Sequence, residues 1–112
     1  MKVCTRCGVE KPLSQFHGQR GRTARSHCRE CHYDKLLLRR YGITLVDFNL
    51  MAKKQGYRCL LCREKKRLVV DHDHGSGEVR GLLCVPCNRF LGTVEWRPQI
   101  LKRIVQYLKG EL

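Results

Sequence analysis

The sequence is poor in acidic and aromatic residues, and it has no long apolar run. Ten Asp and Glu residues stand against 23 Lys and Arg residues, and aromatic residues make up 7% of the 112-residue chain. A chain this short buries a thin core, as one domain or two very small ones, and often needs cross-links for stability. No apolar run is long enough for a signal peptide or a transmembrane helix, so we expect an intracellular protein with no membrane partner.

Cysteine, by contrast, is abundant and regularly spaced. All eight cysteines lie in Cys-x-x-Cys pairs, and the chain reads C-x2-C-x20-C-x2-C and then C-x2-C-x21-C-x2-C. These pairs fit two structural, tetrahedral zinc sites of four thiolates each, and a reducing compartment disfavours disulfides. The simplest grouping is sequential, although the sequence also allows an interleaved one. The sequential sites are Cys4, Cys7, Cys28 and Cys31, and Cys59, Cys62, Cys84 and Cys87.

The excess of basic residues predicts a nucleic-acid partner. The formal net charge is +13; eight zinc-bound thiolates contribute −8 and two Zn²⁺ ions +4, which leaves +9. Such a charge favours phosphate contacts with release of counterions. The alternative is that the charge serves solubility alone, a need that acidic residues would meet equally well.

The first 40 residues predict a zinc-binding segment followed by a helix. Gly8 directly follows the first Cys pair and frees the backbone to turn round a metal. Residues 18–27 have no apolar periodicity and predict a basic loop within an irregular segment. Residues 28–40 contain good helix formers without Gly or Pro, and Gly42 is expected to end that helix.

Three histidines of this first segment are expected at the surface or beside the metal rather than as ligands. His17 and His27 lie outside the Cys pairs. His32 follows Cys31 and can replace a cysteine at the first zinc, but four thiolates already complete a tetrahedral site.

Residues 41–112 predict a second, larger part that contains the functional core and a C-terminal helix. Residues 45–55 repeat apolar side chains at helical spacing. Thr44 is expected to cap this helix with Asp47 at the capping-box distance, although Asp replaces the preferred Glu. Gly56 is a suitable stop.

A β-hairpin and a short helix follow. Residues 67–72 and 78–84 predict two strands, and the glycines between them suit a hairpin turn. A helix that starts near Cys84 would carry Asn88.

The last helix is expected to start near Pro98, which suits a first helical turn. Its apolar stripe is more typical of a buried core face than of an exposed interface. The stripe consists of Ile100, Leu101, Ile104, Val105 and Leu108.

The first strand ends in the sequence Asp-His-Asp-His, which packing alone does not explain. Hydrolysis of a phosphodiester needs a base that removes a proton from water, and His does so near neutral pH. It also benefits from a divalent cation, and Mg²⁺ accepts one carboxylate and one amide oxygen beside its waters. Asp71, His72 and Asn88 supply these parts. Neighbours on a regular strand point to opposite faces, so the strand must end or distort at this point for Asp71 and His72 to share a site.

The stretch "DHDHGSGEVRGLLCVPCNRFLG", together with the upstream "QGYRCLLC" and "YGITLVDFNLM", resembles the phage recombination endonuclease VII family of His-Me finger, or HNH-like, nucleases. The match runs from about Tyr41 to Gly92, and more loosely from Cys28. The combination of Asp-His, zinc-type Cys pairs, "VRGLLC" and "CN" is specific, whereas Asp-His alone is not. The resemblance implies an α+β, zinc-stapled ββα-metal fold, here with flanking helices and an N-terminal zinc knuckle.

The same resemblance implies roles for individual residues. It implies Asp71 and Asn88 as ligands of a catalytic Mg²⁺ or Mn²⁺, and His72 as general base. His74 matches a second histidine of the family motif and contacts the phosphate or the leaving group, unless it is a turn residue. Asp73 either orients a histidine or is solvated.

The implied activity is hydrolysis of DNA, in branched or junction DNA as by a Holliday-junction resolvase, in the cytoplasm of a bacterial host. Arg80 would contact a phosphate beside the site, or it is a solvated strand residue. Two symmetric cuts require a twofold unit, so we expect a homodimer built through apolar helical faces. Two alternatives stay open: a nicking or duplex endonuclease of the HNH type without junction preference, and a non-catalytic zinc module that binds nucleic acid.

Overall fold

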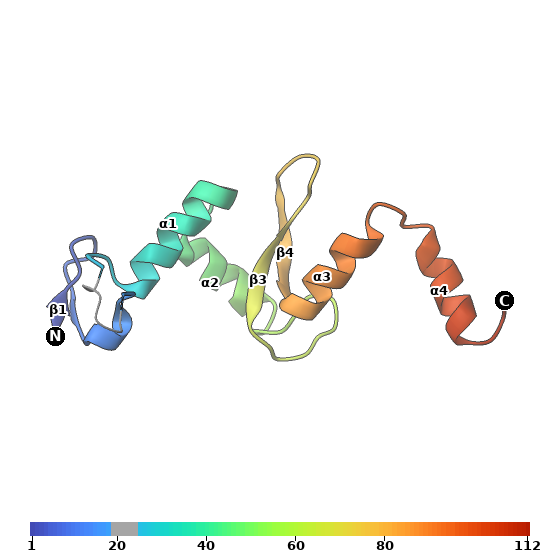
Figure 1. Ribbon diagram of the computed structural model, residues 1–112, viewed down its shortest axis with the longest axis horizontal. Coiled ribbons are helices and arrows are strands. Elements are labelled where there is room, and N and C mark those ends of the chain that lie inside the picture. The colour runs from blue at the N-terminus through green and yellow to red at the C-terminus, as the bar shows by residue number, and fades with distance from the viewer. Residues whose placement is uncertain (19–24) are drawn as a thin grey trace. The chain divides into compact units, whose positions relative to one another are not determined.

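The computed structural model describes residues 1–18 and 25–112 of an α+β protein (Figure 1). The chain divides into two compact units, Met1–Leu50 and Met51–Leu112. Residues 19–24, which make up most of the predicted basic loop, lie outside the described residues. Across the described part of the chain, no helix has the length and apolar character needed to cross a membrane.

In the first unit, two short strands flank the first Cys pair and lead towards a helix. Strand β1 (Lys2–Val3) pairs antiparallel with β2 (Glu10–Lys11), and a 3-10 turn, η1 (Leu13–Gln15), follows. The expectation of a wholly irregular segment missed these elements, which are too short to leave a periodic pattern. Helix α1 (Arg29–Tyr41) begins at the N-cap residue Cys28. The core of this unit is a cluster of four buried side chains: Phe16, Cys4, Cys28 and Cys31.

Local hydrogen bonds set the helix ends where the sequence predicts them. Gly42 adopts the left-handed conformation (φ 71°), and its N–H donates to the Leu38 carbonyl at 3.0 Å. Helix α2 (Leu45–Lys54) starts with a reciprocal pair of bonds. The Asp47 N–H donates to Thr44 Oγ1 at 3.0 Å, and the Thr44 N–H donates to Asp47 Oδ2 at 2.9 Å. The predicted capping box is therefore confirmed.

The second unit contains the predicted hairpin and helix (Figure 1). Strand β3 (Leu68–His72) pairs antiparallel with β4 (Val79–Cys84), and helix α3 (Val85–Val94) follows directly with Cys84 as its N-cap. Helix α3 contacts both strands. Buried and half-buried side chains of these elements pack together with the second knuckle: Cys59, Leu83, Cys84, Leu68, Cys87 and Leu91.

The free edge of β4 is closed by a side chain instead of a third strand. Gln55, which is buried, accepts a hydrogen bond from the Leu82 N–H at 3.0 Å and donates to the Leu82 carbonyl at 2.9 Å. Leu60 N–H also donates to that carbonyl, at 3.2 Å. A Cβ added at the neighbouring Gly81 would lie 2.9 Å from Leu60 Cδ2. The glycine therefore allows the knuckle segment to approach the strand closely.

Helix α4 (Ile100–Leu108) forms as predicted, but the expected burial of its apolar stripe is wrong. No residue of this helix is buried; Val105 is 49% exposed and Leu108 is 78% exposed. The helical period determines which residues share a face, but it does not determine whether another element covers that face.

Candidate active site

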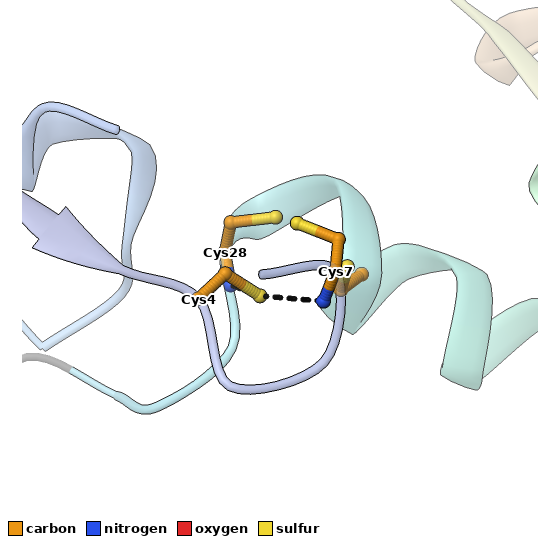
Figure 2. Close-up of side chains that lie close together, drawn as sticks. Cys4, Cys7 and Cys28 are labelled. Carbon is orange, nitrogen blue, oxygen red and sulfur yellow. Dashed lines mark hydrogen bonds between the residues drawn. The ribbon is translucent and has the colours of Figure 1, made fainter. Parts of the chain in front are cut away.

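The cysteines form two clusters in sequential order. In each cluster the four Sγ atoms lie within 4.8 Å of one another. Figure 2 shows three of the side chains of the first cluster, with the Cys7 N–H donating to Cys4 Sγ at 3.5 Å. The interleaved grouping is excluded. The clusters are Cys4, Cys7, Cys28 and Cys31, and Cys59, Cys62, Cys84 and Cys87.

The spacing of the sulfur atoms fits zinc. Four thiolates at about 2.3 Å from a tetrahedral Zn²⁺ are about 3.8 Å apart. Cys62 Sγ and Cys84 Sγ are 3.8 Å apart. Each cluster can thus hold one zinc ion. A site closed by four thiolates leaves no position for a substrate, so the role of such a metal is structural.

The turns that follow Cys4 and Cys59 share one backbone hydrogen bond and one left-handed residue. In the first, Gly8 N–H donates to the Cys4 carbonyl at 2.8 Å, and Gly8 is left-handed (φ 73°). In the second, Arg63 occupies the equivalent position: its N–H donates to the Cys59 carbonyl at 2.9 Å, and its φ is 64°. A left-handed arginine is an uncommon conformation, retained because the turn round the cluster requires it.

The thiols within a cluster differ in acidity. Burial alone would raise the pKa of Cys4, but backbone N–H groups of Cys7 and Cys28 outweigh it and bring the pKa to about 5. Burial, followed by hydrogen bonding with Cys28, raises the pKa of Cys31 to about 12. Cys59 resembles Cys4, with a pKa of about 6 despite its burial. Four neighbouring thiolates require a cation to offset their repulsion, which is what a bound metal supplies.

The strand carrying Asp71 and His72 is distorted between these two residues. Asp71 pairs with Gly81, whereas His72 pairs with Val79, so β4 has one extra residue at this point. Such a bulge breaks the alternation of side chains along the ladder. The distortion that the sequence-based argument required is therefore present, and it lies on the partner strand.

The extra residue, Arg80, pairs with the buried carboxylate. Asp71 is 6% exposed, and Arg80 donates to it from Nε to Oδ2 at 2.8 Å and from Nη2 to Oδ1 at 3.1 Å. Nη2 also donates to Glu95 Oε2 at 3.2 Å. The hydrogen bond to Asp71 is the main cause that raises the pKa of Arg80 above its usual value. Neither sequence-based reading of Arg80, a phosphate contact or a solvated residue, included this pairing.

Glu95 connects Arg80 with His74. Oε1 of Glu95 lies 2.8 Å from Nδ1 of His74, whose side chain is 53% exposed. The rings of His72 and His74 are 4.9 Å apart. Hydrogen bonding with His74 and then with Arg80 lowers the pKa of Glu95, although partial burial opposes it. Sequence reasoning missed Glu95, because no local motif links it to residues 15 and 21 positions earlier.

Asn88 lies on α3, which packs against the hairpin. It is half-buried and precedes Glu95 by seven residues, which places both on one helix face. That face is the one from which Glu95 contacts His74 and Arg80. Helical spacing therefore predicts that Asn88 lies on the side of α3 that faces the Asp-His strand.

Asp73 has a structural role in the turn. Its Oδ1 accepts hydrogen bonds from the N–H groups of Gly75 at 2.8 Å and Ser76 at 2.9 Å. Its backbone pairs with Glu78 and Gly77, both at 2.8 Å. Asp73 thus closes the hairpin turn that positions His72 and His74.

These features define a zinc-stapled ββα protein. A hairpin is followed by a helix, and a four-cysteine cluster closes its base. The hairpin and helix carry Asp71, His72 and Asn88. The chain belongs to the recombination endonuclease VII family, whose model matches residues 34–110. This membership confirms the resemblance seen in the sequence.

Relatives occur in phages. The chain is 40% identical over 102 residues to the Gene 59 protein of Mycobacterium phage L5, and 35% identical over 121 residues to the Gene 59 protein of Mycobacterium phage D29. These alignments cover 87% and 96% of this chain, but only 60% and 73% of the relatives. Among solved structures, the ββα-Me type II restriction endonuclease Hpy99I is 27% identical, with a TM-score of 0.44, over 99% of this chain and 66% of that one.

Proposed function

We propose that this chain is a Mg²⁺-dependent DNA endonuclease whose active site consists of Asp71, His72 and Asn88. The main support is the bulge in β4 opposite Asp71 and His72. The chain that contains this bulge belongs to the recombination endonuclease VII family. The bulge ends regular strand pairing where the two residues lie, so a buried carboxylate and a half-exposed imidazole adjoin at the end of one strand.

The donor atoms fit a hard divalent cation. A carboxylate offers about four acceptor positions, and Arg80 uses two of them on Asp71, one on each oxygen. Within residues 1–18 and 25–112, Arg80 is the one residue whose hydrogen bonds to this carboxylate are described, and Asn88 would add an amide oxygen. One carboxylate, one amide and several waters form a usual Mg²⁺ site, and Mn²⁺ accepts the same donors. When bound there, the ion would stabilise the charge that develops on the phosphate.

His72 would act as the general base. Its imidazole accepts a proton from water while the water oxygen forms a bond to phosphorus, and the bond from phosphorus to the 3′ oxygen breaks. The products are a 5′-phosphate and, after the leaving oxygen takes up a proton, a 3′-hydroxyl. His74, half-exposed and held through Nδ1 by Glu95, presents Nε2 for a contact with the phosphate or for delivery of that proton.

The proposed substrate is branched duplex DNA, cut by a homodimer in the cytoplasm of a bacterial host. The phage relatives support the location, and the charge of +13 before metal binding supports a polyanionic substrate. One site cuts one strand, so paired cuts call for two copies of the chain. The exposed apolar stripe of α4 offers a surface for such an interface.

Cleavage assays on a labelled four-way junction and on a linear duplex of the same arm sequence test this proposal. With Mg²⁺ present, we expect nicking that chelation by EDTA abolishes and that is faster on the junction. Equal rates on both substrates would instead support the nicking or duplex endonuclease. Binding without any cleavage, in Mg²⁺ or Mn²⁺, would support the non-catalytic zinc module.

A further inference from the structure

The first unit contains a cavity that has no part in the proposed catalytic site. Its volume is about 780 Å³, within the range of roughly 300–1,000 Å³ typical of ligand sites. The polar part of its lining comes from the loop before Cys28 and from α1: Arg25, Ser26, His27, His32, Lys35 and Arg39. The family match begins at residue 34, so most of this zinc-binding segment lies outside it.

The cavity gathers three positively charged side chains. Two cations of this unit outside the cavity are paired, Arg6 with Asp34 and Lys11 with Glu30. Within residues 1–18 and 25–112, no carboxylate forms an ion pair with the three cations of the cavity. These cations are Arg25, Lys35 and Arg39.

The walls of the cavity are fixed by the first cysteine cluster. On α1, His32, Lys35 and Arg39 follow one another at three and four residues, so they share a helix face. Cys28 and Cys31 anchor the start of that helix to the cluster. The loop wall is held as well: the Thr5 N–H donates to the Ser26 carbonyl at 3.0 Å. A backbone held in this way loses less freedom on binding than a mobile surface segment does.

We propose that this cavity binds backbone phosphates of nucleic acid and anchors the DNA at a second site, separate from the point of cleavage. Two arginines and a lysine match the charge and the acceptor geometry of phosphate oxygens. His27, His32 and Ser26 add neutral hydrogen-bonding groups at the same place. The inference rests on the proposed function only in taking DNA as the nucleic acid. Because phosphate contacts carry no sequence information, this site adds affinity without adding sequence preference.

Two adjacent arginines of α1 provide a matched test. Both are exposed, but Arg39 lines the cavity and Arg40 does not. We would measure the affinity of the full chain for a fluorescein-labelled duplex by anisotropy in EDTA, for Arg39→Gln, Arg40→Gln and the double variant Lys35→Gln/Arg39→Gln. The double variant should bind roughly tenfold more weakly and lower the slope of log K against log salt by about 2, one unit per lost phosphate contact. Arg40→Gln should stay within about twofold of the wild type.

Equal effects of Arg39→Gln and Arg40→Gln, or wild-type affinity of the double variant, would overturn the inference. Circular dichroism and zinc content identify any variant that fails to fold. In that event, amide NMR shifts of residues 25–27 and 35–39 on addition of duplex to the wild type decide the matter, since shifts support the site and their absence refutes it.

Cleavage measured at saturating DNA separates the two proposals. A chain that binds through the cavity without cutting contradicts only the endonuclease, and one that cuts with unchanged affinity in the double variant contradicts only the cavity.

Discussion

Arg80 donates two hydrogen bonds to the buried carboxylate of Asp71, from Nε to Oδ2 at 2.8 Å and from Nη2 to Oδ1 at 3.1 Å. The pair exists because β4 has one extra residue opposite the end of β3. It holds the carboxylate in one orientation, and Glu95, the residue directly after α3, accepts a hydrogen bond from the same guanidinium at 3.2 Å. The proposed metal ligand is thereby connected to both strands and to the helix.

Replacing Arg80 by Ala should destabilise the protein. The substitution leaves the Asp71 carboxylate buried without its two charged hydrogen bonds, a loss of about 1–3 kcal/mol in the free energy of unfolding. The lower part of this range is expected, because solvent reaches Arg80, whose side chain is 36% exposed. Urea denaturation measures the change. Arg89→Ala, at an exposed position on α3, serves as the control and should shift stability by less than about 0.5 kcal/mol. Equal effects of the two variants would contradict a specific role for the pair.

Glu95→Gln should lower the cleavage rate while leaving zinc content unchanged. The amide keeps the shape of the side chain but removes the charge that orients His74 and Arg80. If poorer orientation of these side chains reduces transition-state stabilisation by about 1.4 kcal/mol, the reaction is tenfold slower. Single-turnover cleavage checks this, and Glu78→Gln in the exposed turn is the control. An unchanged rate would show that the link from Glu95 has no catalytic consequence.

His72→Ala should lower the cleavage rate by roughly 10²–10⁴-fold, the usual contribution of a general base. Affinity for duplex DNA, measured by anisotropy in EDTA, should be retained, because the substitution removes none of the Lys and Arg residues that give the chain its basic charge. Parallel loss of binding and cleavage would mean that His72 is structural.

Asn88→Ala should raise the Mg²⁺ concentration needed for half-maximal cleavage and lower the maximal rate. The reason is the loss of the amide oxygen that completes the proposed donor set. Zinc content should not change, although Cys87 is the neighbouring residue. Titration of activity with Mg²⁺, alongside metal analysis of the purified variant, tests this. An unaltered Mg²⁺ response would remove Asn88 from the ligand set.

Metal analysis of the purified wild-type protein should find two zinc ions per chain, one for each cysteine cluster. Cys59→Ser should abolish the second of these and unfold the second unit, because Cys59 is fully buried in the core and structural zinc contributes folding free energy directly. Circular dichroism of this variant provides the measurement. A folded and active Cys59→Ser protein would refute the structural role of that cluster.

The sequence by itself determined the features that depend on residues close together in the chain. The capping box of Thr44 and Asp47 and the helix end at Gly42 are made by groups three and four positions apart in the chain. Each Cys-x-x-Cys knuckle is equally local. The sequential pairing of the knuckles followed from spacing as the simplest choice, and the structure decided it against the interleaved one.

Only the tertiary structure decided which distant side chains meet. The register shift at Arg80 depends on the whole hairpin ladder, and it converted a residue expected at the phosphate or in solvent into the partner of Asp71. Glu95 joined the site because α3 runs back along the hairpin. The exposure of α4 was likewise not readable from its apolar stripe, since that pattern is the same whether or not another element covers the helix. Hydrogen bonds within one turn are determined by local sequence, whereas contacts between elements depend on how those elements pack.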